Sequence, residues 1–231
     1  MKHHDQTTAS RLLLTRSQRE TFPYEVRAFG LRVLVERGVF SPKHFHGWKT
    51  FTRHFPSVLG KDVLEIGCGT GITAMVIALR GARSIVATDV SRAAVRNARK
   101  NVRLNGLVGT VEIRHGDLFA PIAPRERFDA VYWNMPFMPA PEAYRFRSML
   151  ERSLFDPGYR LTRAFLENGT RVLRPGGRLL VGTADFGDVD QLRHLARAAG
   201  YRMRLLAREA AREIHRVEFQ LFELRLNRPS V

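Results

Sequence analysis

The chain has 231 residues, of which 44% are hydrophobic and 26% are charged, a composition that supports a globular domain with a sizeable core. No apolar run approaches the roughly 20 residues that cross a bilayer, and the polar N-terminus lacks the apolar segment of a secretory signal. We therefore expect a cytoplasmic protein without a membrane partner. The single cysteine, Cys68, excludes an internal disulfide.

The net charge of +16 raises the question of a nucleic-acid partner. The basic excess is six, five and five in residues 1–60, 61–150 and 151–231, so it is spread along the chain. One stripe at helical spacing is local: Arg92, Arg96, Arg99, Lys100 and Arg103. We interpret it as a solvated face rather than an RNA-contact face. Nucleic acid is a possible partner but not the favoured one, and the oligomeric state is not indicated.

The N-terminal part is predicted to be a helical extension over residues 1–57. His3 and His4 in its polar start are interpreted as solvated, and no metal is expected. Residues 23–38 are predicted to form a helix, because Pro23 suits a first turn and apolar residues recur at helical spacing. Residues 39–56 are predicted to form a loop followed by a short helix.

From residue 62 strands and helices alternate. We predict strands at 62–66, 83–89, 110–116, 128–134 and 178–184, with helices at 72–80, 92–105, 161–174 and 188–199. Strands at 201–209 and 215–225 are predicted to close the chain as an antiparallel hairpin. The pattern predicts an α/β fold: a doubly wound, mostly parallel, seven-stranded sheet in a catalytic domain over residues 58–231.

Ligands of such a sheet bind outside the carboxyl ends of its strands. The first strand runs into the sequence VLEIGCGTG (63–71), whose glycines allow a sharp turn and a close approach of a ligand before a helix N-terminus. Glu65 favours a cationic ligand, and Asp89 ends the second strand where a carboxylate commonly holds a ribose diol. Cys68 is interpreted as a small turn residue rather than a nucleophile. These residues predict a pocket for an adenosyl group that carries an amine and a sulfonium.

The set VLEIGCGTG, ATDVS (87–91) and GDLF (116–119), with LRPGG (173–177), resembles the cofactor site of the class I S-adenosylmethionine (SAM)-dependent methyltransferases. The resemblance implies SAM as cofactor. It assigns the methionine part to Glu65 and the loop of Gly67, Cys68, Gly69, Thr70 and Gly71. It assigns the ribose to Asp89 and the adenine to Asp117 with Leu118, and Val90 is a further candidate for cofactor binding. The alternative is a dinucleotide-binding domain, which the glycine spacing disfavours.

The fourth predicted strand ends in Asn134, Met135, Pro136 and Phe137. This stretch resembles the Asn-Pro-Pro-Tyr motif of the methyltransferases that act on amino groups, with Met135 for the first proline and Phe137 for tyrosine. The resemblance implies that Asn134 and the following carbonyl accept hydrogen bonds from a target NH₂ beside SAM, while Phe137 packs on the target plane. The alternative is an Asn in a structural turn.

Two further segments resemble parts of those enzymes. Residues 39–50 resemble a segment that closes over SAM, so His44, His46, Trp48 and Tyr24 are candidates for a lid. Residues 153–169 resemble the loop after the fourth strand, which would bring Asp156 and Tyr159 near the substrate. Packing or a solvated surface is the alternative for each of these residues.

The acceptor is the open question. N-methylation of a small-molecule amine is the favoured hypothesis. Methylation of RNA or of a ribosome-associated protein is a second. In a third, SAM's own α-amine attacks its γ-carbon and forms azetidine-2-carboxylate and methylthioadenosine. A SAM-binding regulator without activity is the fourth, and Asn134 counts against it.

Overall fold

The computed structural model describes residues 3–211 and 217–227, excluding the side chains of residues 3–6 and hence those of His3 and His4. Its helices are α1 (His3–Ser17), α2 (Gly47–Arg53), α3 (Ile72–Leu79), α4 (Arg92–Leu104), η1 (Met149–Ser153), α5 (Arg160–Val172) and α6 (Val189–Ala198). Its strands are β1 (Tyr24–Ala28), β2 (Leu31–Val35), β3 (Asp62–Ile66), β4 (Ser84–Asp89), β5 (Val111–His115), β6 (Phe128–Asn134), β7 (Met138–Ala140), β8 (Phe155–Pro157), β9 (Leu173–Ala184), β10 (Tyr201–Ala210) and β11 (Glu218–Leu226).

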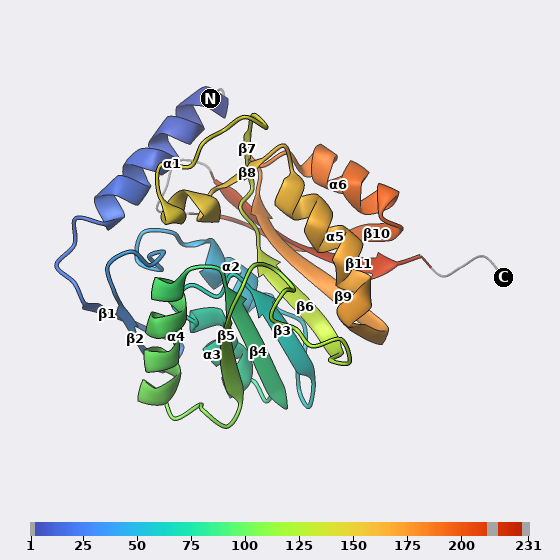
Figure 1. The fold of residues 1–231 in the computed structure, drawn as a ribbon, viewed down its shortest axis with the longest axis horizontal. Helices are drawn as coiled ribbons and strands as arrows, with labels where there is room; N and C mark the ends of the chain where they lie inside the picture. The colour runs from blue at the N-terminus through green and yellow to red at the C-terminus, as the bar shows by residue number, and fades with distance from the viewer. Residues whose placement is uncertain (1–2, 212–216, 228–231) are drawn as a thin grey trace.

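The central sheet has seven strands in the order β10-β11-β9-β6-β3-β4-β5. Five neighbouring strands of this sheet are parallel: β5, β4, β3, β6 and β9. Strand β11 pairs antiparallel with both β9 and β10. This confirms the predicted mostly parallel fold with a C-terminal antiparallel hairpin (Figure 1). Residues 215 and 216 of the second predicted hairpin strand fall outside the described residues.

Both faces of the sheet are covered. Apolar residues of α2, α3 and α4 pack on one face, around Val63, Ile85 and Tyr132. Those of α5 and α6 pack on the other face, around Leu64, Val131 and Leu179. All five residues of β3 are buried, because alternate side chains point to opposite faces of the sheet and helices cover both faces. That double burial explains the continuous apolar run from which the strand was predicted.

The helix predicted over residues 23–38 is wrong. The segment forms an antiparallel hairpin of β1 and β2, in which Ala28 pairs with Leu31. Phe29 and Gly30 form the two-residue turn with φ of +53° and +78°, the conformation that a tight hairpin needs. Residues Leu31, Val33 and Val35 are buried at alternate positions. The β-branched residues of this alternation favour a strand over the coincident helical spacing.

The hairpin is held to α4 by three asparagines one helical turn apart. Asn97, Asn101 and Asn105 accept hydrogen bonds from the backbone N–H groups of residues 36, 34 and 32, at 3.2, 2.8 and 3.0 Å. Their amide groups donate to the carbonyls of residues 34 and 32. The amides therefore satisfy the open edge of β2 as a neighbouring strand would.

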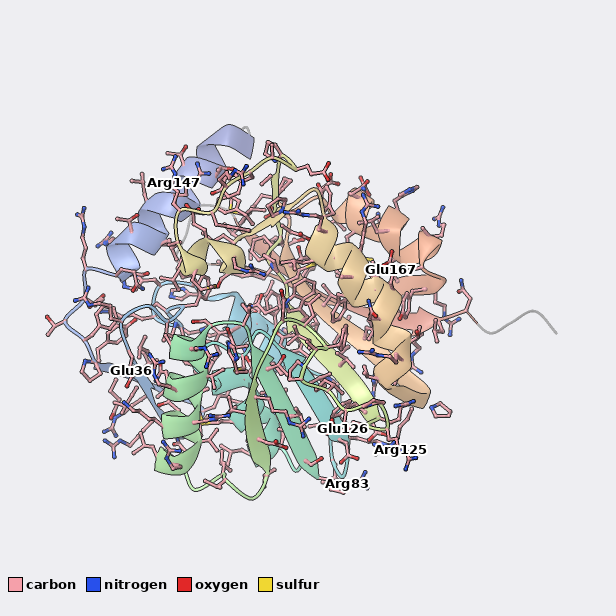
Figure 2. The ribbon with its side chains drawn as sticks, viewed as in Figure 1. Glu36, Arg83, Arg125, Glu126, Arg147 and Glu167 are labelled. Carbon is pink, nitrogen blue, oxygen red and sulfur yellow. The ribbon has the colours of Figure 1, made fainter. Side chains whose placement is uncertain are left out.

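An additional layer covers the carboxyl ends of the strands. Helix α1 lies beside the η1 segment (Figure 1), and Leu14 of α1 packs with Met138, Leu154 and Phe155 around η1. Figure 2 shows Arg147 at this end of the molecule, whereas Arg83 lies at the opposite end. The domain boundary after residue 57 stays a prediction.

Candidate functional site

A cavity of about 230 Å³ lies at the carboxyl ends of β3, β4, β5 and β6. Most of the predicted site residues line it. From the cofactor prediction these are Glu65, Gly67, Cys68, Gly69, Thr70, Asp89, Val90, Asp117 and Leu118; from the acceptor prediction they are Asn134, Met135, Pro136, Phe137, His44, His46 and Trp48.

The glycine loop turns as the sequence predicts. Gly67, Gly69 and Gly71 have φ of +68°, +54° and +78°, a region that favours glycine. Gly71 is the N-cap of α3 and does not line the cavity. A Cβ on Gly71 would lie 3.2 Å from the Cβ of Ala98, so this position sets the approach of α3 to α4. The role of Gly71 is therefore to build the loop.

Cys68 is buried within the same loop, and its N–H donates to the carbonyl of Thr88 at 2.9 Å. Burial raises the pKa of the Cys68 thiol, and the nearby carboxylates of Asp89 and Glu65 raise it further. A thiol that stays protonated is a poor nucleophile. These surroundings favour the interpretation of Cys68 as a small turn residue.

Asp89 connects the ends of β3 and β4. One carboxylate oxygen accepts from the N–H of Gly69 at 2.9 Å, and the other accepts from the N–H of Ser91 at 2.8 Å. Burial raises the pKa of Asp89, and the hydrogen bonds from Ser91 and Gly69 oppose that rise. Each carboxylate oxygen has further acceptor capacity, so Asp89 can shape the loop and also accept from a ribose diol.

Glu65 is buried with 3% of its surface exposed, and its Oε2 atom has no hydrogen-bond partner. Burial raises the pKa of Glu65 to about 8, and the charge of Asp89 adds to the effect. An unpartnered buried carboxylate on a cavity wall requires a donor, preferably a cation. The methionine ammonium of SAM is such a donor, so the residues of this site fit the cofactor.

Asp117 follows Gly116 after β5 and is half exposed. Its carboxylate accepts from the Nη2 of Arg152 in η1 at 3.1 Å. The following residue, Leu118, has φ of +44°, and both residues line the cavity. An acidic acceptor beside an apolar side chain suits the amine edge and the face of an adenine.

Asn134 ends β6 opposite Gly182 of β9. Among the described residues its side-chain amide makes no hydrogen bond, so it is available to a ligand in the cavity. Met135 donates its N–H to the carbonyl of Gly182 at 3.3 Å and buries its side chain in the core. The Phe137 ring packs against Phe186 with centroids 5.2 Å apart. The turn is therefore anchored at Met135 and Phe137, while the Asn134 amide is unused.

Three predicted substrate or lid residues do not line this cavity. Tyr24 in β1 bonds Ser41 through its hydroxyl at 2.6 Å. Asp156 is buried and accepts from the backbone of Leu161 and from the N–H and hydroxyl of Thr162, at the first turn of α5. Tyr159 donates to Asp188 at 3.0 Å. Asp156 and Tyr159 line a separate cavity of about 10 Å³ with residues 135–138, so they support the turn after Asn134 from behind.

Three lid candidates line the large cavity; Trp48 and His46 are held by nearby carbonyls, whereas the His44 ring contacts the Glu20 carboxylate at 2.7 Å. The Trp48 Nε1–H donates to the carbonyl of Pro42 at 2.9 Å, and the His46 ring contacts the carbonyl of Lys43 at 2.7 Å. These contacts fix a wall beside the glycine loop.

The lining residues that sequence reasoning did not single out include Ser10 and Leu13 of α1, Arg152 of η1, and Phe186 after β9. Phe186 could have been found, because the loop after every parallel strand is a candidate position. The polar sequence of α1 gives no comparable signal, since its place over the cavity depends on tertiary packing.

The fold and the cavity define a class of protein: a doubly wound enzyme that binds a nucleoside cofactor at the carboxyl ends of its strands. More particularly, the chain belongs to the methyltransferase small domain family, whose sequence model matches residues 30–209. This family agrees with the resemblance of the motifs to the SAM-dependent methyltransferases.

Curated relatives that match the chain are named as methyltransferases. The chain is 35% identical over 127 residues to the release factor glutamine methyltransferase of Cereibacter sphaeroides, covering 52% of this chain and 45% of the relative. It is 34% identical over 134 residues to that of Gloeobacter violaceus, covering 53% and 46%. The chain thus spans about half the length of the curated relatives it matches.

A solved structure shares the fold. The ribosomal protein L11 methylase of Lactobacillus delbrueckii subsp. bulgaricus superposes with a TM-score of 0.58 at 16% identity, covering 82% of each chain. The family and the curated relatives support methyl transfer and give no support to the hypothesis of SAM cyclisation to azetidine-2-carboxylate. In the part of the chain that the structure describes, no helix has the length and apolarity to cross a membrane.

Proposed function

We propose that this methyltransferase methylates the side-chain amide nitrogen of a glutamine residue in a protein. The carrying observation is the unused amide of Asn134, which ends β6 on the cavity wall. Its oxygen, with the carbonyl of Met135, can accept from the two hydrogens of a planar NH₂ group.

The charges that line the cavity support a neutral acceptor. Its acidic residues are Glu65, Asp89 and Asp117, and all three belong to β3, β4 and the loop after β5. Among the described residues, the walls from α1, η1, the end of β6 and Phe186 contribute none. A charged ammonium acceptor would lack a counter-charge there, whereas an amide needs only hydrogen-bond acceptors.

The named activity of the relatives supports the same acceptor, since two release factor glutamine methyltransferases match the chain. That activity belongs to those proteins. Together with the lack of acidic residues on the acceptor wall, it favours a protein amide over the small-molecule amine that the sequence favoured.

The residues that line the cavity have separate roles in the proposed reaction. When bound, SAM supplies an electrophilic methyl group. Glu65 would bind the methionine ammonium of the cofactor and Asp89 its ribose. Asn134 would orient the acceptor nitrogen toward the methyl group. Transfer of the methyl group from bound SAM would release S-adenosylhomocysteine and develop positive charge on the acceptor nitrogen. The oxygens of Asn134 and Met135 would disperse this charge until the nitrogen releases its proton to water as the product leaves. Phe137 and Phe186 form an apolar wall that excludes water.

The test compares acceptors under identical conditions. Purified protein and SAM are incubated with a glutamine-containing protein fraction, with RNA, with small amines and alone, and mass spectrometry locates the added methyl group. We expect methylation of glutamine. A methyl group found only on RNA or on small amines would refute the proposal.

Asn134→Ala should retain binding of S-adenosylhomocysteine and lower kcat by about 10²-fold, because it removes a group that acts on developing charge. Asn168→Ala is a matched control, since Asn168 is exposed on α5 and bonds only its own helix. Full turnover by Asn134→Ala would return Asn134 to a structural role.

A further inference from the structure

Arg152 is a charged residue of the cofactor cavity that the sequence did not single out. It belongs to η1 and lines the cavity. Its Nη2 donates to Asp117 at 3.1 Å, and its guanidinium lies 5.7 Å from the ring centroid of Phe146. Its Nε atom is buried and has no hydrogen-bond partner.

The position of Arg152 is fixed by its neighbour. Glu151 is buried, accepts from the Tyr144 hydroxyl and the Arg147 N–H at 2.8 Å each, and pairs with Arg11 of α1 at 3.7 Å. Arg11 also lies over the Tyr144 ring. Glu151 therefore anchors η1 to α1, while Arg152 extends to the loop after β5. The guanidinium is positioned before any ligand arrives.

A buried guanidinium N–H without an acceptor is costly, and a ligand that supplies the acceptor is correspondingly favoured. The guanidinium of Arg152 and the carboxylate of Asp117 lie beside each other, and both residues line the cavity. Adenine presents the complementary pair: an exocyclic amine that donates, with ring nitrogens beside it that accept.

We propose that Arg152 is a specificity-determining residue for the cofactor. Asp117 accepts from the adenine amine, and the Arg152 Nε–H donates to a ring nitrogen beside that amine. The pair then distinguishes adenine from a base whose edge carries a carbonyl. This inference rests on SAM as the cofactor and is independent of the acceptor's identity.

The test uses two ligands and titration calorimetry, so it needs no turnover. S-adenosylhomocysteine carries the amine, and S-inosylhomocysteine has a carbonyl oxygen in its place. We expect the wild-type protein to bind the adenosyl compound at least about tenfold more tightly, the scale of a hydrogen bond to a charged group. In Arg152→Met, affinity for the adenosyl compound should fall about tenfold and the preference should shrink.

Arg152→Lys distinguishes a direct contact with the adenine from the positioning of Asp117, because lysine keeps a positive charge beside Asp117 but has no Nε–H. We expect Arg152→Lys to lose the same adenosyl affinity. Wild-type affinity in this variant would overturn the proposal and show that Arg152 only positions Asp117. If Arg152→Met fails to fold, Arg152→Lys alone carries the test.

Arg147→Met is the matched control. Arg147 lies in the same segment, and its side chain is exposed (Figure 2). The Arg147→Met variant should bind both ligands as tightly as the wild-type protein does. A wild-type protein that binds neither ligand would contradict the cofactor assignment instead, so the two failures are distinguishable.

Discussion

Replacing Glu65 by glutamine should stabilise the free protein while weakening its hold on the cofactor. Burial raises the pKa of Glu65 from its ordinary value of 4.5 to about 8. Between these values the folded protein keeps a proton that the unfolded chain has released. Stability therefore falls as pH rises through this window, and it stops falling above about pH 8.

The size of the effect follows from the two pKa values. Linkage gives a loss of about 3 kcal/mol at pH 7 and of about 5 kcal/mol well above pH 8, as order-of-magnitude values. Glutamine is neutral at every pH and retains an oxygen that can accept from Thr73 and Ala74. Glu65→Gln should thus remove this part of the pH slope and be more stable than the wild type at pH 8.

The assay is urea unfolding at pH 5, 6, 7, 8 and 9 for the wild type, Glu65→Gln and Glu167→Gln. Glu167 is an exposed residue on α5 and serves as the control (Figure 2). Calorimetry should also show that Glu65→Gln binds S-adenosylhomocysteine about 10- to 100-fold more weakly, since a charge-assisted hydrogen bond is lost. If Glu65→Gln unfolds with the wild-type pH slope, burial does not hold the proton on Glu65 and the reasoning is refuted.

Two other substitutions test the frame of the site. Asp89→Ala should abolish detectable binding of S-adenosylhomocysteine in calorimetry, because it removes a ribose acceptor and frees the N–H groups of residues 69 and 91; unchanged affinity would contradict the assignment. Asn101→Ala should lower the free energy of unfolding by about 2–4 kcal/mol, since Asn101 is fully buried and its loss leaves the N–H of Leu34 without an acceptor and the carbonyl of Thr70 without this donor. Chemical denaturation would measure this, with Asn168→Ala as the control; a change below about 0.5 kcal/mol would show that the asparagine ladder is not needed to hold the hairpin.

Local sequence patterns predicted the parts of the fold whose signals are local. The strands at β3 and β6 match their predicted bounds, 62–66 and 128–134, because double burial leaves uninterrupted apolar runs. The glycine loop was predictable because positive φ restricts residue choice at Gly67 and Gly69. The hairpin of β1 and β2 was not predicted, because Val26, Val33 and Leu34 fit helical spacing while Leu31, Val33 and Val35 alternate as in a strand. The asparagines that stabilise β2 lie more than 60 residues away.

The candidate site divides in the same way. By itself the sequence determined the cofactor end, since parallel strands bring the residues at their carboxyl ends to one edge of the sheet wherever they lie in the chain. It also placed Asn134 at that edge. Only the tertiary structure decided what surrounds them. It placed Ser10 and Leu13 over the cavity and Arg152 beside Asp117, and it assigned Asp156 to the first turn of α5. Those positions depend on packing between segments far apart in the chain, which no local pattern encodes.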